Sequence, residues 1–194
     1  MILKNGNTSL RTINRNDIAQ IRTWRNQEIV NRYLVNPARI SEEEQEKWFG
    51  NIDYSNSIYF MMEEASAAFG VIYAHNINLR DKSFEGSIFT GNQDDFNAPL
   101  PVKAGLMLTI FFFDRLHFAC AFSKVHHKNK AALDLDRRFG FKELTREGDF
   151  IISRCSKHDF EIHTSRLRKS LLKNQSVEVI LEKGDEKFSF LPKE

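Results

Sequence analysis

Hydrophobic and polar positions in the first half of the chain alternate between the two-residue period of strands and the longer period of helices. Residues 8–13, 57–62, 68–75 and 82–90 are rich in β-branched and aromatic residues, a pattern typical of strands. Only short polar segments separate the last three of these runs. Because parallel strands need a long crossover, these three strands are predicted to form an antiparallel meander.

Helical spacing places three segments between the first two strands. Residues 18–26 and 27–34 are predicted to form two short helices, and the second ends before Pro37 because the residue preceding a proline avoids the α region. A third helix is predicted to begin after Ser41, whose hydroxyl and the Glu44 carboxylate have the spacing of a capping box.

The second half of the chain alternates helix and strand. A loop with two prolines, residues 94–101, precedes an apolar helix over residues 102–116 that is predicted to be buried. A strand over 118–125 and a helix over 128–138 follow, and Gly140 suits a left-handed cap at the end of that helix. This order implies a βαβ crossover with some parallel pairing, so the predicted fold class is α/β with a mixed, mostly antiparallel sheet.

The C-terminal residues differ in composition from the rest. Strands beginning at residue 141 and covering 150–154 are predicted to complete a domain of residues 1–157. Residues 158–194 are expected to form an extension packed on that domain. It would consist of a helix with a basic stretch and a β-hairpin made of residues 177–181 and 187–190.

Charge and composition narrow the function classes. The net charge is only +2, so neither a nucleic acid nor a membrane surface is expected as a partner. The N-terminal residues lack the basic and apolar regions of a signal peptide, which makes the reducing cytoplasm the expected location. Nine glycines leave few places for a glycine-cradled phosphate site, and no dinucleotide fingerprint, P-loop lysine or serine-hydrolase elbow is present.

The sequence gives no indication of a metal site. Cys120 and Cys155 are the only cysteines, and the apolar surroundings of Cys120 predict a buried thiol. His126 and His127 are adjacent, so on a strand their side chains are expected to point to opposite faces and not to share a metal.

Several segments together resemble the GNAT superfamily of N-acetyltransferases. Residues 129–141 are similar to the family element N-x-x-A-x-x-x-Y-x-x-x-G-F, with Asp136 at the tyrosine position. Segments within residues 10–49, including Trp24-Arg25-Asn26, resemble the branch that acetylates ribosomal protein N-termini and amino sugars of bacterial surface-glycan pathways.

The resemblance implies a GNAT-like sheet with helices on both faces and one parallel strand pair that splays apart to receive the pantetheine arm of acetyl-CoA. It implies that the pyrophosphate binds at the start of the helix between these strands. By position, it assigns Glu85 as the catalytic base. The residues that it implies for acetyl-CoA are Phe89, Thr90, Lys103, Ala104, Gly105 and Asn129.

The sequence departs from the family pattern at two places. The expected glycine-rich pyrophosphate loop is replaced by a segment with two prolines, which lack N–H donors. Asp136 replaces the tyrosine that protonates the leaving thiolate, and an aspartate is ionised at neutral pH unless burial raises its pKa. A solvated helix carboxylate is therefore the expected state of Asp136.

The first helices are implied to form the wall of the acceptor site. The residues assigned to this wall are Trp24, Arg25, Asn26, Tyr33 and Trp48. A small-molecule amine is the expected acceptor, preferably an amino sugar or a nucleotide-linked amino sugar, with a protein N-terminus second. The alternative is a GNAT-fold protein with a degenerate acetyl-CoA site that serves as a binding or assembly module, and the Phe-rich helix and C-terminal hairpin would then suit a partner surface or a homodimer.

Overall fold

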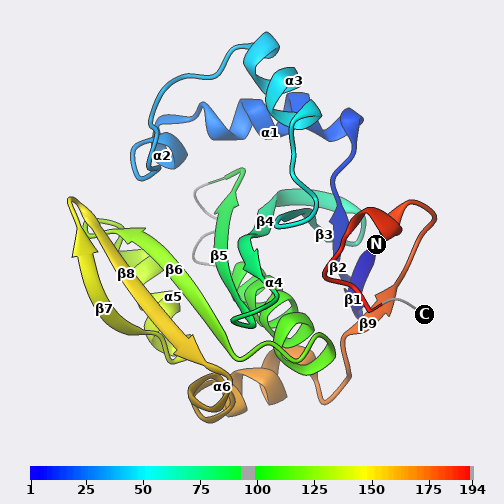
Figure 1. Ribbon diagram of the computed structural model, residues 1–194, viewed down its shortest axis with the longest axis vertical. Coiled ribbons are helices and arrows are strands. Elements are labelled where there is room, and N and C mark those ends of the chain that lie inside the picture. Colours follow the sequence, from blue (N-terminus) through cyan, green and yellow to red (C-terminus); the bar gives the residue numbers. More distant parts are fainter. Residues whose placement is uncertain (93–98, 193–194) are drawn as a thin grey trace.

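A computed structural model describes residues 1–92 and 99–192 and shows a single mixed sheet covered by helices (Figure 1). The order of the nine strands in it is β7-β8-β6-β5-β4-β3-β2-β1-β9. The strands are β1 (Ile2–Asn5), β2 (Thr8–Thr12), β3 (Ile58–Glu64), β4 (Ala67–Asn78), β5 (Ser83–Thr90), β6 (Cys120–His126), β7 (Lys142–Glu147), β8 (Phe150–Ser156) and β9 (Glu178–Ile180). The helices are η1 (Arg15–Asp17), α1 (Ile18–Arg25), α2 (Glu28–Asn31), α3 (Glu42–Gly50), α4 (Pro99–Ile110), η3 (Phe111–Arg115), α5 (Lys130–Phe139), α6 (Lys157–Leu172) and η4 (Asp185–Lys187).

Side-chain alternation along β3 divides the core into two layers. Phe60 and Met62 point to the larger core, which is shared with α4 and α6, whereas Met61 points to the smaller core under α1. This is the period of two that a strand buried on both faces requires. The helices therefore cover both faces of the sheet, as the sequence predicts.

The phenylalanines concentrate in the larger core. The fully buried ones are Phe60, Phe84, Phe111, Phe112, Phe113, Phe118 and Phe160. The three consecutive ones begin η3, a π-helical turn that continues α4. The Phe-rich helix is thus explained by burial within the chain rather than by a partner surface, and a homodimer stays a prediction.

Most predicted elements are confirmed with shifted ends. The meander β3-β4-β5 is antiparallel, Ser41 and Glu44 form the capping box of α3, and Gly140 ends α5 at φ +88°. Helix α4 begins at Pro99, three residues earlier than expected. The first turn of a helix tolerates proline, because the N–H groups there have no acceptor within the helix and none of its hydrogen bonds is lost. Strand β1 was not predicted from the sequence, since it is only four residues long.

The predicted C-terminal hairpin is wrong. Strand β9 pairs antiparallel with β1, with Leu3 opposite Val179, and residues 187–190 form no strand. Instead Phe188 and Phe190 are buried in the larger core. The unpaired edge of β1 offers β9 a ready partner, and burial of the two rings draws the following residues away from the sheet.

Strands β5 and β6 form the one parallel pair among the described strands, and they pair for only three positions. Ser83, Phe84 and Glu85 lie opposite residues 120–122, after which the two strands diverge (Figure 1). Strand β6 continues along β8 and β5 continues along β4. The facing backbone groups beyond Glu85 therefore lack partners from the neighbouring strand, which is the predicted splay.

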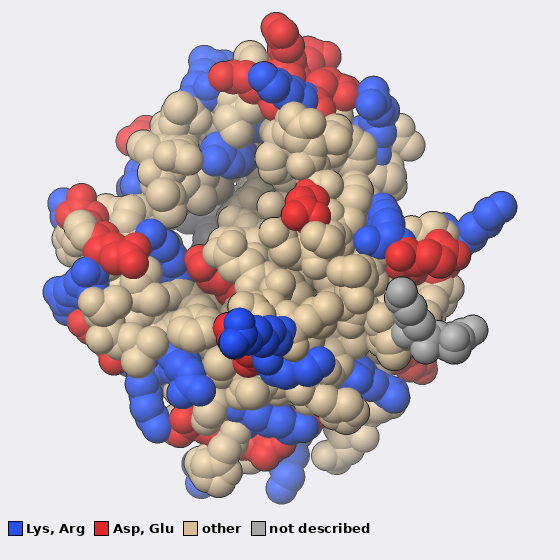
Figure 2. Space-filling view, in the orientation of Figure 1, with Lys and Arg blue, Asp and Glu red and all other residues tan. Residues whose placement is uncertain are grey.

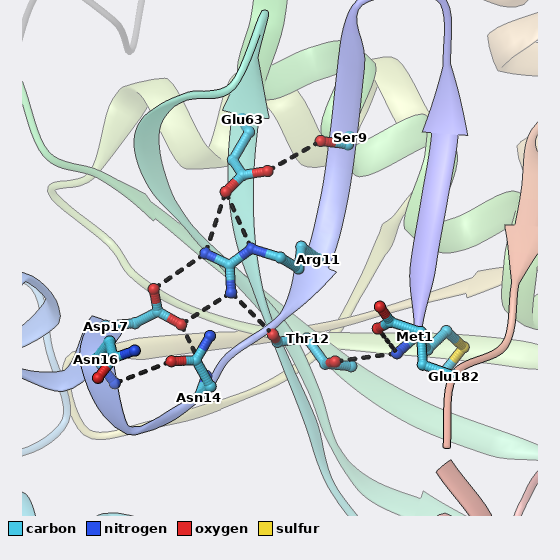
Figure 3. Close-up of polar contacts among 9 residues, drawn as sticks. All are labelled: Met1, Ser9, Arg11, Thr12, Asn14, Asn16, Asp17, Glu63 and Glu182. Carbon is cyan, nitrogen blue, oxygen red and sulfur yellow. Dashed lines mark hydrogen bonds and ion pairs between the residues drawn. The ribbon is translucent and has the colours of Figure 1, made fainter. Parts of the chain in front are cut away.

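A partly buried ion cluster joins the first strands to the turn before α1 (Figure 3). The Arg11 guanidinium donates to both carboxylate oxygens of Asp17 at 3.0 Å and, through Nε, to Glu63 at 3.1 Å. The hydrogen bond to Asp17 is the main cause that raises the pKa of Arg11 above its ordinary value. In the same view, the Met1 amino group contacts Glu182 at 2.8 Å, which ties the segment after β9 to β1.

Arg11→Met is expected to lower the free energy of unfolding by about 2–3 kcal/mol, because it leaves two poorly solvated carboxylates without a cation. Arg15→Met is the matched control, since Arg15 is 71% exposed and its ion pair with Glu46 should contribute less than about 1 kcal/mol. Urea unfolding of both variants measures the difference. Equal small losses would contradict a structural role for the cluster.

None of the helices within residues 1–92 and 99–192 combines the length and the apolar character needed to cross a membrane.

Candidate active site

A cavity of about 530 Å³ opens where β5 and β6 diverge. Its walls come from α1 to α3 on one side, β4 and β5 at the base, and β6 and α5 on the other side. The surface is visibly hollowed between α2 and the β6–β8 part of the sheet (Figure 2). The same divergence that interrupts the sheet thus produces a cavity lined by both halves of the sheet.

Glu85 lies at the point of divergence and faces this cavity. One carboxylate oxygen accepts a hydrogen bond from Asn76 Nδ2 at 3.1 Å, and the other lies 3.4 Å from His75 Nε2. His75 is directly opposite Glu85 in the β4–β5 register. The carboxylate is therefore held in place while its side chain remains 19% exposed and accessible.

Burial lowers the pKa of His75 below its ordinary value, and the Glu85 carboxylate opposes this effect. The imidazole is accordingly neutral at pH 7, when it can accept a proton. His75 was not assigned from the sequence. Its only sequence signal is its place on a strand adjacent to that of Glu85, and pairing this histidine with this glutamate required the strand register.

Asp136 is not the solvated carboxylate expected from the sequence. It lines the cavity, and Ser123 Oγ donates to its Oδ2 at 2.6 Å. Burial raises the pKa of Asp136 to about 6, against the smaller opposing effect of Ser123. The correction arises because α5 packs this turn against β6, a contact that helical periodicity alone does not reveal.

The raised pKa of Asp136 makes the stability of the protein depend on pH. Asp136 binds its proton more tightly in the folded state than in the unfolded chain, so its contribution to stability falls as the pH rises from 3.8 through about 6. At pH 7, Asp136→Asn is expected to be more stable than the wild type by about 2 kcal/mol, with little difference at pH 4. Denaturant unfolding at both pH values measures this. A constant difference between the two proteins would contradict the shifted pKa.

Three residues predicted to bind acetyl-CoA lie near the end of β5 or the start of α5. Phe89 lines the cavity, and Asn129 lines it while its side chain caps α5 by accepting from Ala132 N at 3.2 Å. Thr90 is buried and donates to the Asn92 carbonyl at 3.0 Å. Two of the three are therefore accessible from the cavity.

Lys103, Ala104 and Gly105, which were predicted to bind acetyl-CoA at the start of α4, make other contacts. Lys103 Nζ donates to the Asn5 carbonyl at 2.9 Å, and burial lowers the pKa of Lys103. Ala104 and Gly105 are buried, and a Cβ at Gly105 would lie only 3.0 Å from the Phe139 ring, so this glycine permits close packing of α4. None of the three lines the cavity. Most of the proline-containing loop, residues 94–98, lies outside the described residues.

The predicted acceptor wall is partly assembled. Arg25, Tyr33 and Trp48 line the cavity. Asn26 does not line the cavity. Its side chain donates to the Ile40 carbonyl and accepts from the Ile40 N–H, both at 2.8 Å. Trp24 is buried in the smaller core under α1 and does not line the cavity.

Two tyrosines that were not assigned from the sequence complete this wall. Tyr59 and Tyr73 are stacked with ring centroids 4.9 Å apart, and Trp48 contacts Tyr59 edge-on at 5.1 Å. Both lie in the β3–β4 register, directly opposite one another. Strand alternation could place each on the face of α1, but their pairing required the register.

The two adjacent histidines differ from the expectation of opposite faces. The rings of His126 and His127 are stacked, with centroids 4.8 Å apart, because β6 ends at His126 and the chain turns there. No group of three potential metal ligands occurs among the residues that the structure describes. Cys120 is buried, as predicted.

The chain is an α/β protein with a mixed sheet and a cavity between two diverging parallel strands. A family model described as Acetyltransferase (GNAT) domain matches residues 10–159. The chain therefore belongs to the GNAT acetyltransferase family. A search of curated proteins gave no match.

Solved structures share the fold at low sequence identity. FdhC, a nucleotide-linked sugar GNAT in its apo form, has a TM-score of 0.73 and 19% identity over 88% of this chain and 98% of its own. RimL, the ribosomal L7/L12 α-N-protein acetyltransferase in complex with coenzyme A, has a TM-score of 0.69 and 15% identity over 80% and 98%. Spermidine N-acetyltransferase from Vibrio cholerae, with CoA and spermine, has 0.69 and 19% over 80% and 99%. Their acceptors differ, so these similarities establish the fold and leave the acceptor open.

Proposed function

We propose that this protein transfers the acetyl group of acetyl-CoA to a primary amine in the cavity between β5 and β6. The observation that carries the proposal is the divergence of these strands directly after Glu85, with a cavity at that point in a chain of the GNAT family. The site places a carboxylate where the strands separate and a neutral histidine beside it.

The described residues fit the pantetheine part of acetyl-CoA. The strand edges beyond Glu85 offer backbone donors and acceptors without partners on the neighbouring strand, which suits a linear molecule with two amides. Asn129 lies on the β6 side of the same opening. When bound, acetyl-CoA supplies an acetyl group activated as a thioester.

Glu85 is the proposed proton acceptor for the amine. An alkylamine is protonated at neutral pH and becomes nucleophilic only after losing its proton. The Glu85 carboxylate, fixed by Asn76, takes this proton directly or through a water, and His75 can share it across 3.4 Å. The C–N bond then forms as the C–S bond breaks, and the second proton that the nitrogen loses in becoming an amide passes to water.

Asp136 is the proposed proton donor to the departing thiolate. With a pKa of about 6, a fraction of this carboxyl remains protonated at neutral pH. Ser123 orients it through a 2.6 Å hydrogen bond. The two carboxyl groups are therefore proposed to act in opposite directions, with burial raising the pKa of Asp136 toward that of a proton donor.

An amino sugar, preferably nucleotide-linked, is the proposed acceptor, and a protein N-terminus is second. The aromatic wall of Trp48, Tyr59 and Tyr73 supports a flat or ring-shaped acceptor, since such rings pack on aromatic faces. Arg25 adds a cation to the same wall.

A non-catalytic binding module is the second candidate. It is favoured by the first turn of α4, where Pro99 and Pro101 remove two backbone donors that a pyrophosphate could use, and by Lys103, whose ammonium is bound to Asn5.

Calorimetric titration with acetyl-CoA, with CoA and ATP for comparison, tests the two candidates. Micromolar binding of acetyl-CoA and CoA but not ATP supports the enzyme, and an acceptor screen with amino sugars and peptides then follows. Absence of binding up to millimolar acetyl-CoA would rule out the acetyltransferase and leave the binding module.

A further inference from the structure

Arg25 is an unpaired cation in the wall of the cavity. It lies in the last turn of α1, and its Nη1 atom is buried without a hydrogen-bond partner. It forms no ion pair with any of the residues that the structure describes. Because a guanidinium is always charged and offers five donors, a guanidinium nitrogen that is buried without an acceptor is costly.

Three of the four glutamates of the neighbouring α3 have other partners. Glu42 pairs with Arg22 at 3.6 Å, and Glu44 accepts from the Ser41 backbone at 2.7 Å in the capping box. Glu46 pairs with Arg15. Arg15 and Arg22 are therefore paired with α3, whereas Arg25, which lines the cavity, has no acidic partner among the described residues.

The surroundings of Arg25 strengthen any interaction with an anion. Arg25 is half-buried beside the aromatic wall, and Tyr73 in that wall interacts with it electrostatically. Burial lowers the pKa of Arg25, which confirms an environment that disfavours an isolated charge. In such a site, a bidentate pair with a phosphate or carboxylate is strong and geometrically specific.

We infer that the acceptor carries an anionic oxygen group, a phosphate or a carboxylate, which binds the Arg25 guanidinium while its amine faces Glu85. This rests on the proposed acetyltransferase function and narrows its substrate class. The other carboxylate, ammonium and imidazole groups that line the cavity are Glu44, His75, Glu85, Lys124, His126 and Asp136, and the phenols there are Tyr33, Tyr59 and Tyr73. Lys124 is paired with Glu147 at 2.7 Å, so Arg25 is the cation available to the ligand. A purely cationic polyamine would find no counterpart for Arg25.

The kinetic test compares acceptors that differ by one group. Glucosamine 6-phosphate and UDP-linked glucosamine test a phosphate, muramic acid tests a carboxylate, glucosamine lacks both, and spermidine is purely cationic. In the wild type, kcat/KM for at least one of the anionic acceptors should exceed kcat/KM for glucosamine by about 10- to 100-fold. Arg25→Gln should reduce that ratio to near one, and Arg25→Lys should retain part of it. Arg22→Gln, one turn earlier on α1, should keep the wild-type ratio.

A binding measurement without catalysis separates this inference from the proposed function. Inorganic phosphate at 50 mM should raise the Tm of the wild type and of Arg22→Gln by about 2–5 °C, and should do so much less for Arg25→Gln. If acetyl-CoA does not bind but this protection depends on Arg25, the anion site stands and only the acetyltransferase fails. The inference is overturned if phosphate protects Arg25→Gln as well as the wild type, or if the wild type prefers glucosamine or spermidine.

Discussion

Glu85→Gln lowers kcat by about 10²- to 10⁴-fold in the expected result, because glutamine keeps the shape and the hydrogen bond from Asn76 but cannot accept a proton. The affinity for acetyl-CoA should stay unchanged, since Glu85 acts on the amine. Steady-state rates over a range of pH, together with calorimetric binding of acetyl-CoA, measure the two effects separately.

Two further variants sharpen this experiment. Glu178→Gln is the matched control, because this exposed glutamate lies on β9, away from the cavity. His75→Gln should cost only about 10-fold if Glu85 is the acceptor and histidine shares the proton. A nearly inactive His75→Gln beside an active Glu85→Gln would contradict the assignment and identify the imidazole as the base.

Phe112→Ala should lower the free energy of unfolding by about 3–5 kcal/mol. The Phe112 ring is fully buried, stacks on Phe84 with centroids 4.1 Å apart and meets Phe118 edge-on at 5.1 Å. Its removal would leave a cavity between α4 and the sheet that rigid neighbours cannot fill. The expected fall in Tm is on the order of 10 °C, measured by thermal and urea unfolding.

Leu144→Ala is the control for this variant, since Leu144 is 57% exposed on β7 and should change stability by less than about 0.5 kcal/mol. A loss for Phe112→Ala below about 1.5 kcal/mol would show that the core can collapse around the missing ring. That result would contradict a tightly packed interface between the π-helical turn and β5.

The periodicity of the sequence predicted most elements, and the order of strands and helices implied some parallel pairing, whereas the splayed parallel pair was implied by the family resemblance. The periodicity did not predict correctly which strands pair when the two segments lie far apart in the chain. Residues 177–181 and 187–190 both resemble strands, but only the first found a free strand edge, on β1. The last phenylalanines joined the core instead, because burying an aromatic ring outweighs forming a marginal two-stranded hairpin.

The candidate site was predicted in part. Glu85, Arg25, Tyr33, Trp48, Phe89 and Asn129 line the cavity. Lys103 was expected near a pyrophosphate because it lies near the start of an apolar helix, yet its side chain reaches back to Asn5. The direction in which a side chain on a helix points depends on the elements packed beside that helix, whereas the sequence shows only the spacing of residues along it.

What the sequence alone determined are local properties: the capping box of Ser41, the left-handed turn at Gly140, the alternation of β3 and the family element over residues 129–141. These depend on neighbours within a few residues of one another. The tertiary structure decided the proton affinity of Asp136, the pairing of His75 with Glu85 and the unpaired guanidinium of Arg25. Burial and partnership are set by residues far apart in the chain, so these chemical properties exist only once the sheet and helices enclose the cavity.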